Sequence, residues 1–301
     1  MSSEVERSVD SPGRDSGSFV LDLNTTSMLV SATRCLLHAP IGPAVSTRTG
    51  AVSLGFVVSL LDIAASEPAL SSCRPDWTAT QDLSVHASGW LVDGPVVVDT
   101  KLLRVGKKTI SVSASVYDGH GVDDLDQLRR SIDAGRSLVS HDDPTLVAKG
   151  LLTFARIPGS SAAGMADYDP AKWLGMIRRR TPDRPPTETL EARMQVHVVD
   201  AAAGVLELAR RHFVTNSIGT IFGGAQATLL QLAAEGMRPG LSATDMQLHY
   251  LAQLKVGPVR TLGCVLRDAR DHSVVSVELR DAGHDDQLLA LATITLQPMK
   301  T

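Results

Sequence analysis

The chain has 301 residues, of which 43% are hydrophobic and 4% aromatic, and its formal net charge is −4. This length allows one large core or two ordinary ones, so we expect two domains of roughly 130 residues each. The negative charge and the few aromatic side chains argue against a nucleic-acid partner, which needs a basic field and stacking platforms.

The N-terminus and the cysteines indicate the compartment. Residues 1–18 are polar, with almost no apolar side chain, so we expect a disordered tail and no signal peptide. No later run approaches the roughly 20 apolar residues of a membrane span, so none is expected. Cys35, Cys73 and Cys264 are scattered without metal-ligand spacing. The sequence therefore predicts no disulfide framework, no metal site and a cytoplasmic location.

The pattern of the first domain, residues 19–158, predicts one long helix followed by a meander of strands. The apolar segment "GAVSLGFVVSLLDIAAS" (50–66) is helical in pattern, and the β-branched residues of 96–105 and 109–118 are typical of strands. An insertion over 119–145 contains the charged run "DDLDQLRRSID", which predicts a surface helix. A last strand is expected over 148–158.

The middle of the chain reads as a linker. Residues 159–186 are rich in Pro, Gly and Ser, and we expect a short helix around Trp173. The basic run Arg178–Arg180 could meet a ligand phosphate, although a solvated face is the simpler interpretation.

The second half, residues 187–301, repeats this organisation. Apolar residues recur at helical spacing through 222–237, and strands follow over 260–269, 273–282 and 290–298. The two halves match each other at constant offsets, which supports an internal duplication. Offset by 169 residues, the two helices match, and offset by 163 residues the strands match at polar as well as apolar positions: Asp82/Asp245, His86/His249, Gly94/Gly257, Ser113/Ser276 and Asp118/Asp281.

The segment that opens the second helix carries the motif Asn216-x-x-Gly219-Thr220-x-x-Gly223-Gly224. A helix wrapped by an antiparallel sheet and opened in this way resembles the hotdog fold, and the motif is similar to that of small acyl-CoA thioesterases of the phenylacetyl-CoA and 4-hydroxybenzoyl-CoA type. The resemblance implies an α+β double hotdog: two long helices, each wrapped by an antiparallel sheet, with the sheets joined across a pseudo-dimer interface. It further implies an acyl-CoA substrate, no cofactor and a possible homodimer of double hotdogs.

The same resemblance implies one composite catalytic site. Asn216 and the amide of Gly223 would come from the second unit, and Asp62 and Thr80 from the first. Thioester hydrolysis builds negative charge on the carbonyl oxygen, which helix N-terminal amides stabilise. Asp62 lies in an apolar helix, where burial raises the pKa of a carboxyl group. The opposite site should be inactive, because its four positions hold Thr47, Leu54, Gln231 and Ala243.

Four further residues are expected to bind substrate. Gly224 would let the acyl group approach the backbone, although tight helix packing is the alternative role for the glycines. Phe222 stands where the family usually has His. Together with Leu54 and Phe56, it predicts an apolar acyl tunnel between the two helices.

Other interpretations remain open. Ala51-x-Ser53-x-Gly55 approximates the nucleophile elbow of a serine α/β-hydrolase, a fold that needs alternating strands and helices. A non-catalytic protein that binds acyl-CoA or serves as a scaffold is the second alternative, because fold alone confers no activity. His86 and His249 recur at matching strand positions, which indicates a shared structural preference rather than a metal site.

Overall fold

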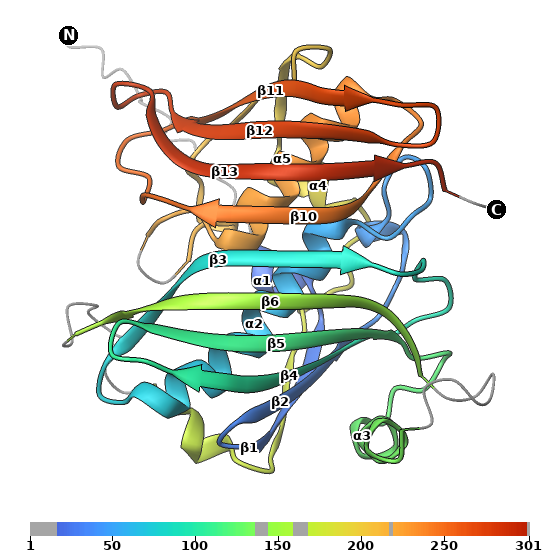
Figure 1. Ribbon diagram of the computed structural model, residues 1–301, viewed down its shortest axis with the longest axis vertical. Coiled ribbons are helices and arrows are strands. Elements are labelled where there is room, and N and C mark those ends of the chain that lie inside the picture. Colours follow the sequence, from blue (N-terminus) through green and yellow to red (C-terminus); the bar gives the residue numbers. More distant parts are fainter. Residues whose placement is uncertain (1–16, 136–143, 159–167, 217–218, 300–301) are drawn as a thin grey trace, which may run out of the picture.

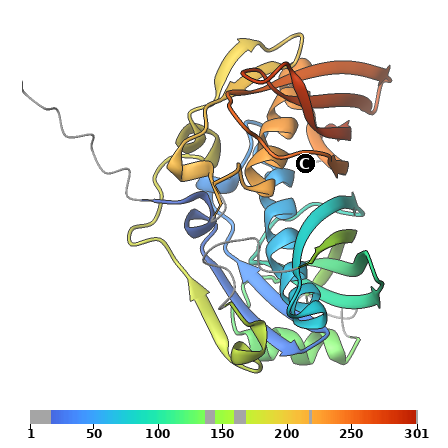
Figure 2. The same ribbon diagram turned by 90° about the vertical axis from the view of Figure 1, so that its left-hand side faces the viewer.

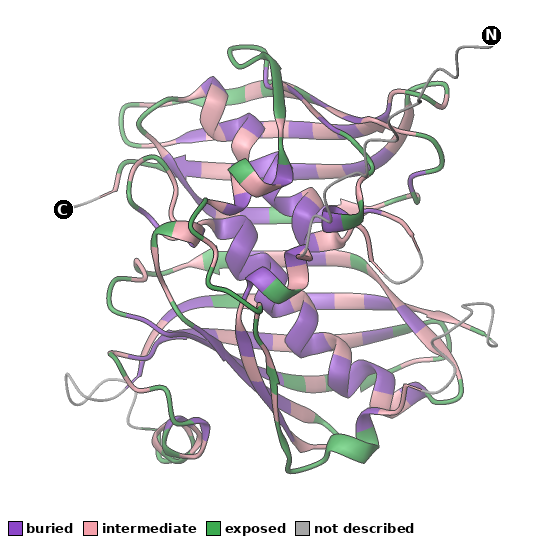
Figure 3. Ribbon diagram, turned by 180° about the vertical axis from the view of Figure 1, so that it is seen from behind, coloured by how far each residue is buried: buried purple, intermediate pink, exposed green. Residues whose placement is uncertain are grey.

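Two long helices, α2 (Leu54–Cys73) and α5 (Gly223–Met237), lie against one face of a single sheet (Figures 1 and 2). The structure is a computed structural model and describes residues 17–135, 144–158, 168–216 and 219–299. All the paired strands are antiparallel, and the buried residues gather on the two helices and on the sheet face behind them (Figure 3). The predicted α+β double hotdog is therefore confirmed.

The first unit holds α2 in a curved sheet. Its strand β5 alternates buried and partly exposed residues, so that one face packs on α2 and the other faces outward. The elements are α1 (Phe19–Asp22), β1 (Thr25–Ser31), β2 (Arg34–Ala39), η1 (Pro43–Val45), α2, β3 (Trp77–Ala87), β4 (Val96–Val105), β5 (Thr109–Asp118), α3 (Leu125–Asp133) and β6 (Thr145–Ile157).

The second unit repeats the arrangement around α5, and its strand β12 alternates buried and partly exposed residues along its whole length. Its elements, with those that connect the units, are η2 (Pro170–Trp173), β7 (Ile177–Arg180), α4 (Leu190–Met194), β8 (His197–Asp200), β9 (Val205–Leu208), η3 (His212–Val214), α5, β10 (Ser242–Tyr250), β11 (Val259–Asp268), β12 (Ser273–Asp281) and β13 (Gln287–Gln297).

The units join where β3 pairs with β10, in a sheet ordered β7-β1-β2-β4-β5-β6-β3-β10-β13-β12-β11-β9-β8. Two reciprocal pairs cross this seam: His249 Nδ1 lies 2.5 Å from Asp82 Oδ1, and His86 Nδ1 lies 3.3 Å from Asp245 Oδ1. These histidines therefore belong to the unit interface, which gives the structural preference inferred from their matching positions a physical basis.

Equivalent hydrogen bonds show the duplication in atomic detail. The backbone N–H of Ser53 donates to Val45 O, and 169 residues later Phe222 N–H donates to Val214 O, both at 2.8 Å. The turn before each helix is built in the same way, so the two helices begin in pseudo-equivalent surroundings.

The helices touch each other at two glycines. A Cβ on Gly55 would lie 2.5 Å from Thr228 Cα, and one on Gly224 would lie 2.1 Å from Ser59 Oγ. Only glycine permits this approach. The acyl tunnel expected between the helices is therefore wrong, because backbone and side chains fill that space. Leu54 and Phe56, its expected walls, belong to the buried core, with 6% and 0% of their surface exposed.

The remaining predictions concern the connecting segments. The charged insertion forms α3, as expected. The range predicted as a linker contains η2 and also β7, which pairs with β1 and so extends the first unit's sheet. Of the tail predicted over 1–18, residues 1–16 lie outside the described residues, as do 136–143 of the insertion and 159–167 of the linker, and Ser18 caps α1. Helix α2 is long and apolar enough to cross a membrane, but 83% of the relevant window is buried within the protein.

Candidate active site

One cavity of about 280 Å³ brings together the four residues expected to act in catalysis. Asp62 comes from the middle of α2 and Thr80 from β3, whereas Asn216 and Gly223 come from the turn before α5 and from its first residue. The two units thus contribute two residues each to the same space. The fold places them there because the middle of α2 packs against the start of α5.

Asp62 is held by a hydroxyl and faces the start of α5. Thr80 Oγ1 donates a 2.5 Å hydrogen bond to Asp62 Oδ1, and Asp62 Oδ2 lies 3.4 Å from the point that a Cβ on Gly223 would occupy. Burial raises the pKa of the Asp62 carboxyl to about 6, while the hydrogen bond from Thr80 acts in the opposite direction. The group can therefore exchange a proton near neutral pH.

The start of α5 offers backbone donors to the cavity. Its N-cap residue, Phe222, supplies no side-chain acceptor. Among the described residues, no protein atom accepts a hydrogen bond from the backbone N–H of Gly223, Gly224 or Ala225. Such amides carry the positive end of the helix dipole and suit an anionic oxygen.

Asn216 shapes the turn that precedes α5. Its Oδ1 accepts from Thr220 N–H at 3.2 Å, and its backbone N–H donates to Thr220 O at 2.8 Å. The side chain lines the cavity from this turn. A role for Asn216 in positioning the substrate remains a prediction.

Tyr250, at the end of β10, is a further residue of this site. Its hydroxyl donates a 2.9 Å hydrogen bond to Gly223 O, and it lines the same cavity. Burial, with a further contribution from the charge of Asp62, raises the pKa of Tyr250 well above its ordinary value, so the hydroxyl stays protonated. Nothing in the sequence pointed to this residue, because the duplication pairs it with Ala87 and the motif does not include it.

The pseudo-equivalent site is filled by a glutamine. Gln231 Oε1 accepts hydrogen bonds from Ser53 Oγ at 2.9 Å and from Gly55 N–H at 2.7 Å, and its Nε2 donates to Glu235 at 2.7 Å. The space beside Thr47 and Gln231 amounts to about 20 Å³. The N–H of Gly55, at the start of α2, therefore already has a hydrogen-bond acceptor.

The residues predicted to bind the acyl group divide into two sets. Phe222 lines the cavity and packs against Phe19, with ring centroids 5.7 Å apart. Gly224 packs against Ser59 as a helix contact, and Leu54 and Phe56 lie in the core. These three are absent from the described cavity lining, so their proposed contact with substrate is not supported.

A second cavity, of about 420 Å³, adjoins the first along α2. The two share Asp62, Ser66, Leu70, Trp77 and Phe222. A larger cavity of about 660 Å³ beside residues 182–187 shares no residue with either. The space available to a substrate at Asp62 therefore extends from the start of α5 toward the C-terminal half of α2.

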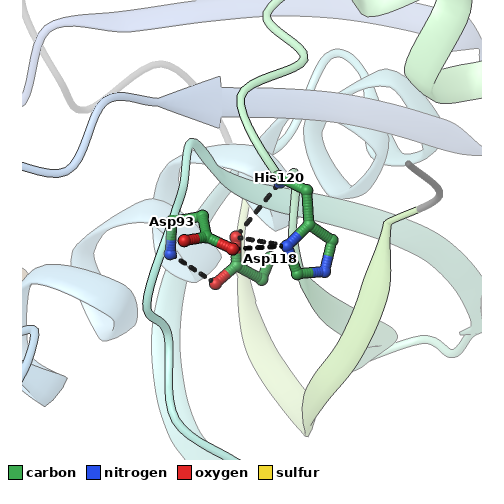
Figure 4. Close-up of side chains that lie close together, drawn as sticks. All are labelled: Asp93, Asp118 and His120. Carbon is green, nitrogen blue, oxygen red and sulfur yellow. Dashed lines mark hydrogen bonds and ion pairs between the residues drawn. The ribbon is translucent and has the colours of Figure 1, made fainter. Parts of the chain in front are cut away.

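A group of metal-ligand side chains elsewhere is explained by loop structure (Figure 4). Asp118 accepts from the backbone N–H groups of Val92, Asp93, Gly94 and His120. The ring of His120 uses both nitrogens, with Asp93 Oδ2 and Thr145 Oγ1 each at 2.8 Å. Asp281 closes the corresponding loop of the second unit through Lys255, Val256 and Gly257. The cluster thus fixes a loop of the first unit, and Asp281 fixes the equivalent loop of the second.

The serine α/β-hydrolase interpretation is wrong. Ser53 is the N-cap of α2, where its Oγ accepts from Phe56 N–H and donates to Gln231. A nucleophile elbow requires a sheet of parallel strands alternating with helices. The sheet here is antiparallel, so Ser53 has a capping role.

Comparisons with known proteins agree with the fold. Residues 214–297, which contain α5 and four strands after it, match a family model described as "Acyl-CoA thioesterase N-terminal domain". The search of curated proteins gave no match.

Solved structures resemble both units, over most of the chain. The chain described as an oleoyl thioesterase (putative) from Lactobacillus plantarum is 11% identical, with a TM-score of 0.58, and the match covers 91% of this chain and 99% of that one. A 12:0-ACP thioesterase from Umbellularia californica is 11% identical, with a TM-score of 0.54 and coverages of 88% and 94%. An acyl-ACP thioesterase from Bacteroides thetaiotaomicron is 10% identical, with a TM-score of 0.52 and coverages of 88% and 98%. At these identities the likeness establishes the double hotdog fold.

Proposed function

We propose that this double hotdog protein hydrolyses acyl-CoA thioesters at one composite site formed by Asp62, Thr80, Asn216 and Gly223. The observation that carries the proposal is that these residues, from two units, line one cavity in which the Asp62 carboxyl faces the start of α5. The match of residues 214–297 to the acyl-CoA thioesterase family model supports it, since that segment includes α5 and Asn216.

Asp62 supplies the base. With a pKa of about 6, it is ionised at neutral pH and is close enough to that pH to accept a proton readily. A water molecule beside Asp62 and Thr80 gives its proton to the carboxylate while its oxygen bonds to the thioester carbonyl carbon. Direct attack by the carboxylate, followed by hydrolysis of the resulting anhydride, would use the same group.

The α5 amides stabilise the negative charge that develops on the carbonyl oxygen. The N–H groups of Gly223 and Gly224 have no protein acceptor in the described chain, so they need not break a bond to receive the oxyanion. When the tetrahedral intermediate collapses, the carbon–sulfur bond breaks, and the proton held by Asp62 passes to the sulfur. The products are the free acid and CoA.

Release of CoA thiol from a panel of acyl-CoAs tests the proposal. Asp62→Asn should lower kcat by about 10²- to 10⁴-fold, the usual effect of removing a general base. Asn216→Ala should also reduce turnover, whereas Thr47→Ala, its pseudo-equivalent control, should not. Hydrolysis that survives Asp62→Asn, or binding of acyl-CoA without turnover by the unaltered protein, would contradict the proposal.

A further inference from the structure

The cavity of about 420 Å³ beside Asp62 is apolar along its length but charged at its far end. Ile63, Leu70, Trp77 and Phe222 form apolar walls, and Glu67, Tyr168 and Arg180 close the end away from the start of α5. We propose that this cavity is the acyl pocket of the enzyme and that it selects acyl chains whose distal end carries an anionic group. The proposal rests on the proposed thioesterase activity.

The geometry of α2 sets the length of chain that fits. Asp62, Ser66 and Leu70 recur at intervals of four residues, and Ile63 and Glu67 form the neighbouring row, so all face the same cavity. Asp62 and Glu67 are five residues apart, a rise of about 7.5 Å along the helix. An extended chain advances about 1.2 Å per bond, so about six bonds separate the reacting carbonyl from the charged end.

The charges at that end do not cancel. Glu67, which is 5% exposed, accepts hydrogen bonds from Tyr168 Oη at 2.6 Å and from Arg178 at 3.1 Å. Arg178 is held in turn by Trp173, whose ring centroid lies 4.7 Å from the guanidinium carbon. Arg180 is left with a longer contact, 3.5 Å from Glu67. Two arginines therefore surround one carboxylate, leaving a net charge of +1.

Strand β7 directs Arg180 into this space. Because side chains alternate along a strand, Arg178 and Arg180 share one face of β7 while Arg179 lies on the other and is exposed. The strand forms the edge of the sheet beside β1 (Figure 2). Arg180 thus lines the cavity, whereas Glu67 already accepts hydrogen bonds from Tyr168 and Arg178.

The end group of the acyl chain decides how well it fits. A terminal methyl group would remove water from Arg180 without replacing its hydrogen bonds, which is costly. A terminal carboxylate would accept a charge-assisted hydrogen bond from Arg180 and balance the excess charge. The pocket should therefore favour a dicarboxylic acyl-CoA over an alkyl acyl-CoA of the same length.

The test compares adipoyl-CoA with hexanoyl-CoA, which have six carbons each and differ at the distal end. We expect kcat/KM for adipoyl-CoA to be higher by about tenfold or more, as one charge-assisted hydrogen bond predicts. Arg180→Leu should abolish that preference by slowing adipoyl-CoA, whereas hexanoyl-CoA, whose methyl end no longer strips water from a charged side chain, should be hydrolysed as fast as before or faster. Arg180→Lys should keep part of the preference. Arg179→Leu, on the opposite face of the same strand, is the matched control and should change neither substrate. Arg180→Gln repeats the test if the leucine variant melts at a lower temperature.

Each other outcome has a defined meaning. Equal hydrolysis of the two substrates, with Asp62 still required, would overturn this inference and leave the proposed function intact. An equal loss with both substrates in Arg180→Leu would show that Arg180 meets the CoA moiety, and would also overturn it. If no acyl-CoA is hydrolysed, the proposed function fails, and calorimetric binding of the same two compounds to the unaltered protein and to Arg180→Leu still decides the end-group preference.

Discussion

Gln231 Oε1 accepts a 2.7 Å hydrogen bond from the backbone N–H of Gly55, at the start of α2. The pseudo-equivalent partners are Asp62 and Gly224, but the shorter Asp62 side chain bonds to Thr80 instead, and the Gly224 amide has no acceptor among the described residues. One half of the duplicated site is thus closed by its own side chain, and the other half is open to a ligand.

Replacing Gln231 should affect stability more than activity. Gln231→Ala leaves the Gly55 amide without its acceptor in a buried position, and Gln231 is itself 1% exposed. We expect a loss of about 1–3 kcal/mol in the free energy of unfolding, measured by urea denaturation. Turnover by the folded fraction should stay within about threefold of the unaltered protein, since Gln231 is not part of the Asp62 cavity. A loss comparable to that of Asp62→Asn would mean that both halves act in catalysis.

The pH dependence of activity should follow Asp62. The carboxylate is the active form, so kcat/KM should rise with pH and level off above a midpoint near the pKa of about 6. Thr80→Val removes a hydrogen bond that favours the ionised carboxyl, so its midpoint should move to higher pH. Thr78→Val is the control, because Thr78 lines the same cavity and has no hydrogen bond to Asp62. If the midpoint did not move in Thr80→Val, the group that titrates in the pH profile would not be Asp62.

Asp62 should also make stability depend on pH. Its folded pKa of about 6 is above the ordinary value of 3.8, so the fold favours the protonated carboxyl. The favourable contribution is fully present below about pH 4 and is lost as the pH rises through about 6. Asp62→Asn cannot ionise. Its Tm should therefore match that of the unaltered protein at pH 4 and exceed it at pH 8. A lower Tm at pH 8 would show that the ionised carboxylate stabilises the fold.

Tyr250 should act by positioning the backbone at the start of α5. Its hydroxyl binds Gly223 O, and the peptide plane that contains this oxygen also contains the N–H of Gly224. Tyr250→Phe should lower kcat by about tenfold with little change in KM, because an amide that is less well fixed stabilises the oxyanion less well. Tyr117→Phe, in a different core cluster, is the control. An unchanged kcat in Tyr250→Phe would exclude the positioning role.

The double hotdog fold could be predicted because the duplication is visible in the residue register and the motif over 216–224 resembles that of a known family, whereas the composite site was implied by that resemblance. The offset that aligns the two helices places Asp62 opposite Gln231, and this difference becomes the open and closed sites of the structure. The role of Tyr250 could not be predicted from the sequence, because it depends on a long-range contact with Gly223 O. The expected tunnel failed for a similar reason: the approach of Gly55 to Thr228 depends on how two distant helices pack, which helical periodicity does not specify. Strand β7 has only four residues, too few to show a pattern within a Pro- and Gly-rich segment.

We expect one working site in each chain, and the number of molecules of a non-hydrolysable acyl-CoA thioether bound per chain measures this. The closed site offers about 20 Å³, against about 280 Å³ at Asp62, so isothermal titration calorimetry should give one thioether molecule bound per chain. Gln231→Ala should leave the stoichiometry at one, because Thr47 and Leu54 still occupy the remaining positions of that half. Two equivalent thioether molecules bound per unaltered chain would mean that both halves of the duplicated site accept a ligand, and the single-site proposal would fail.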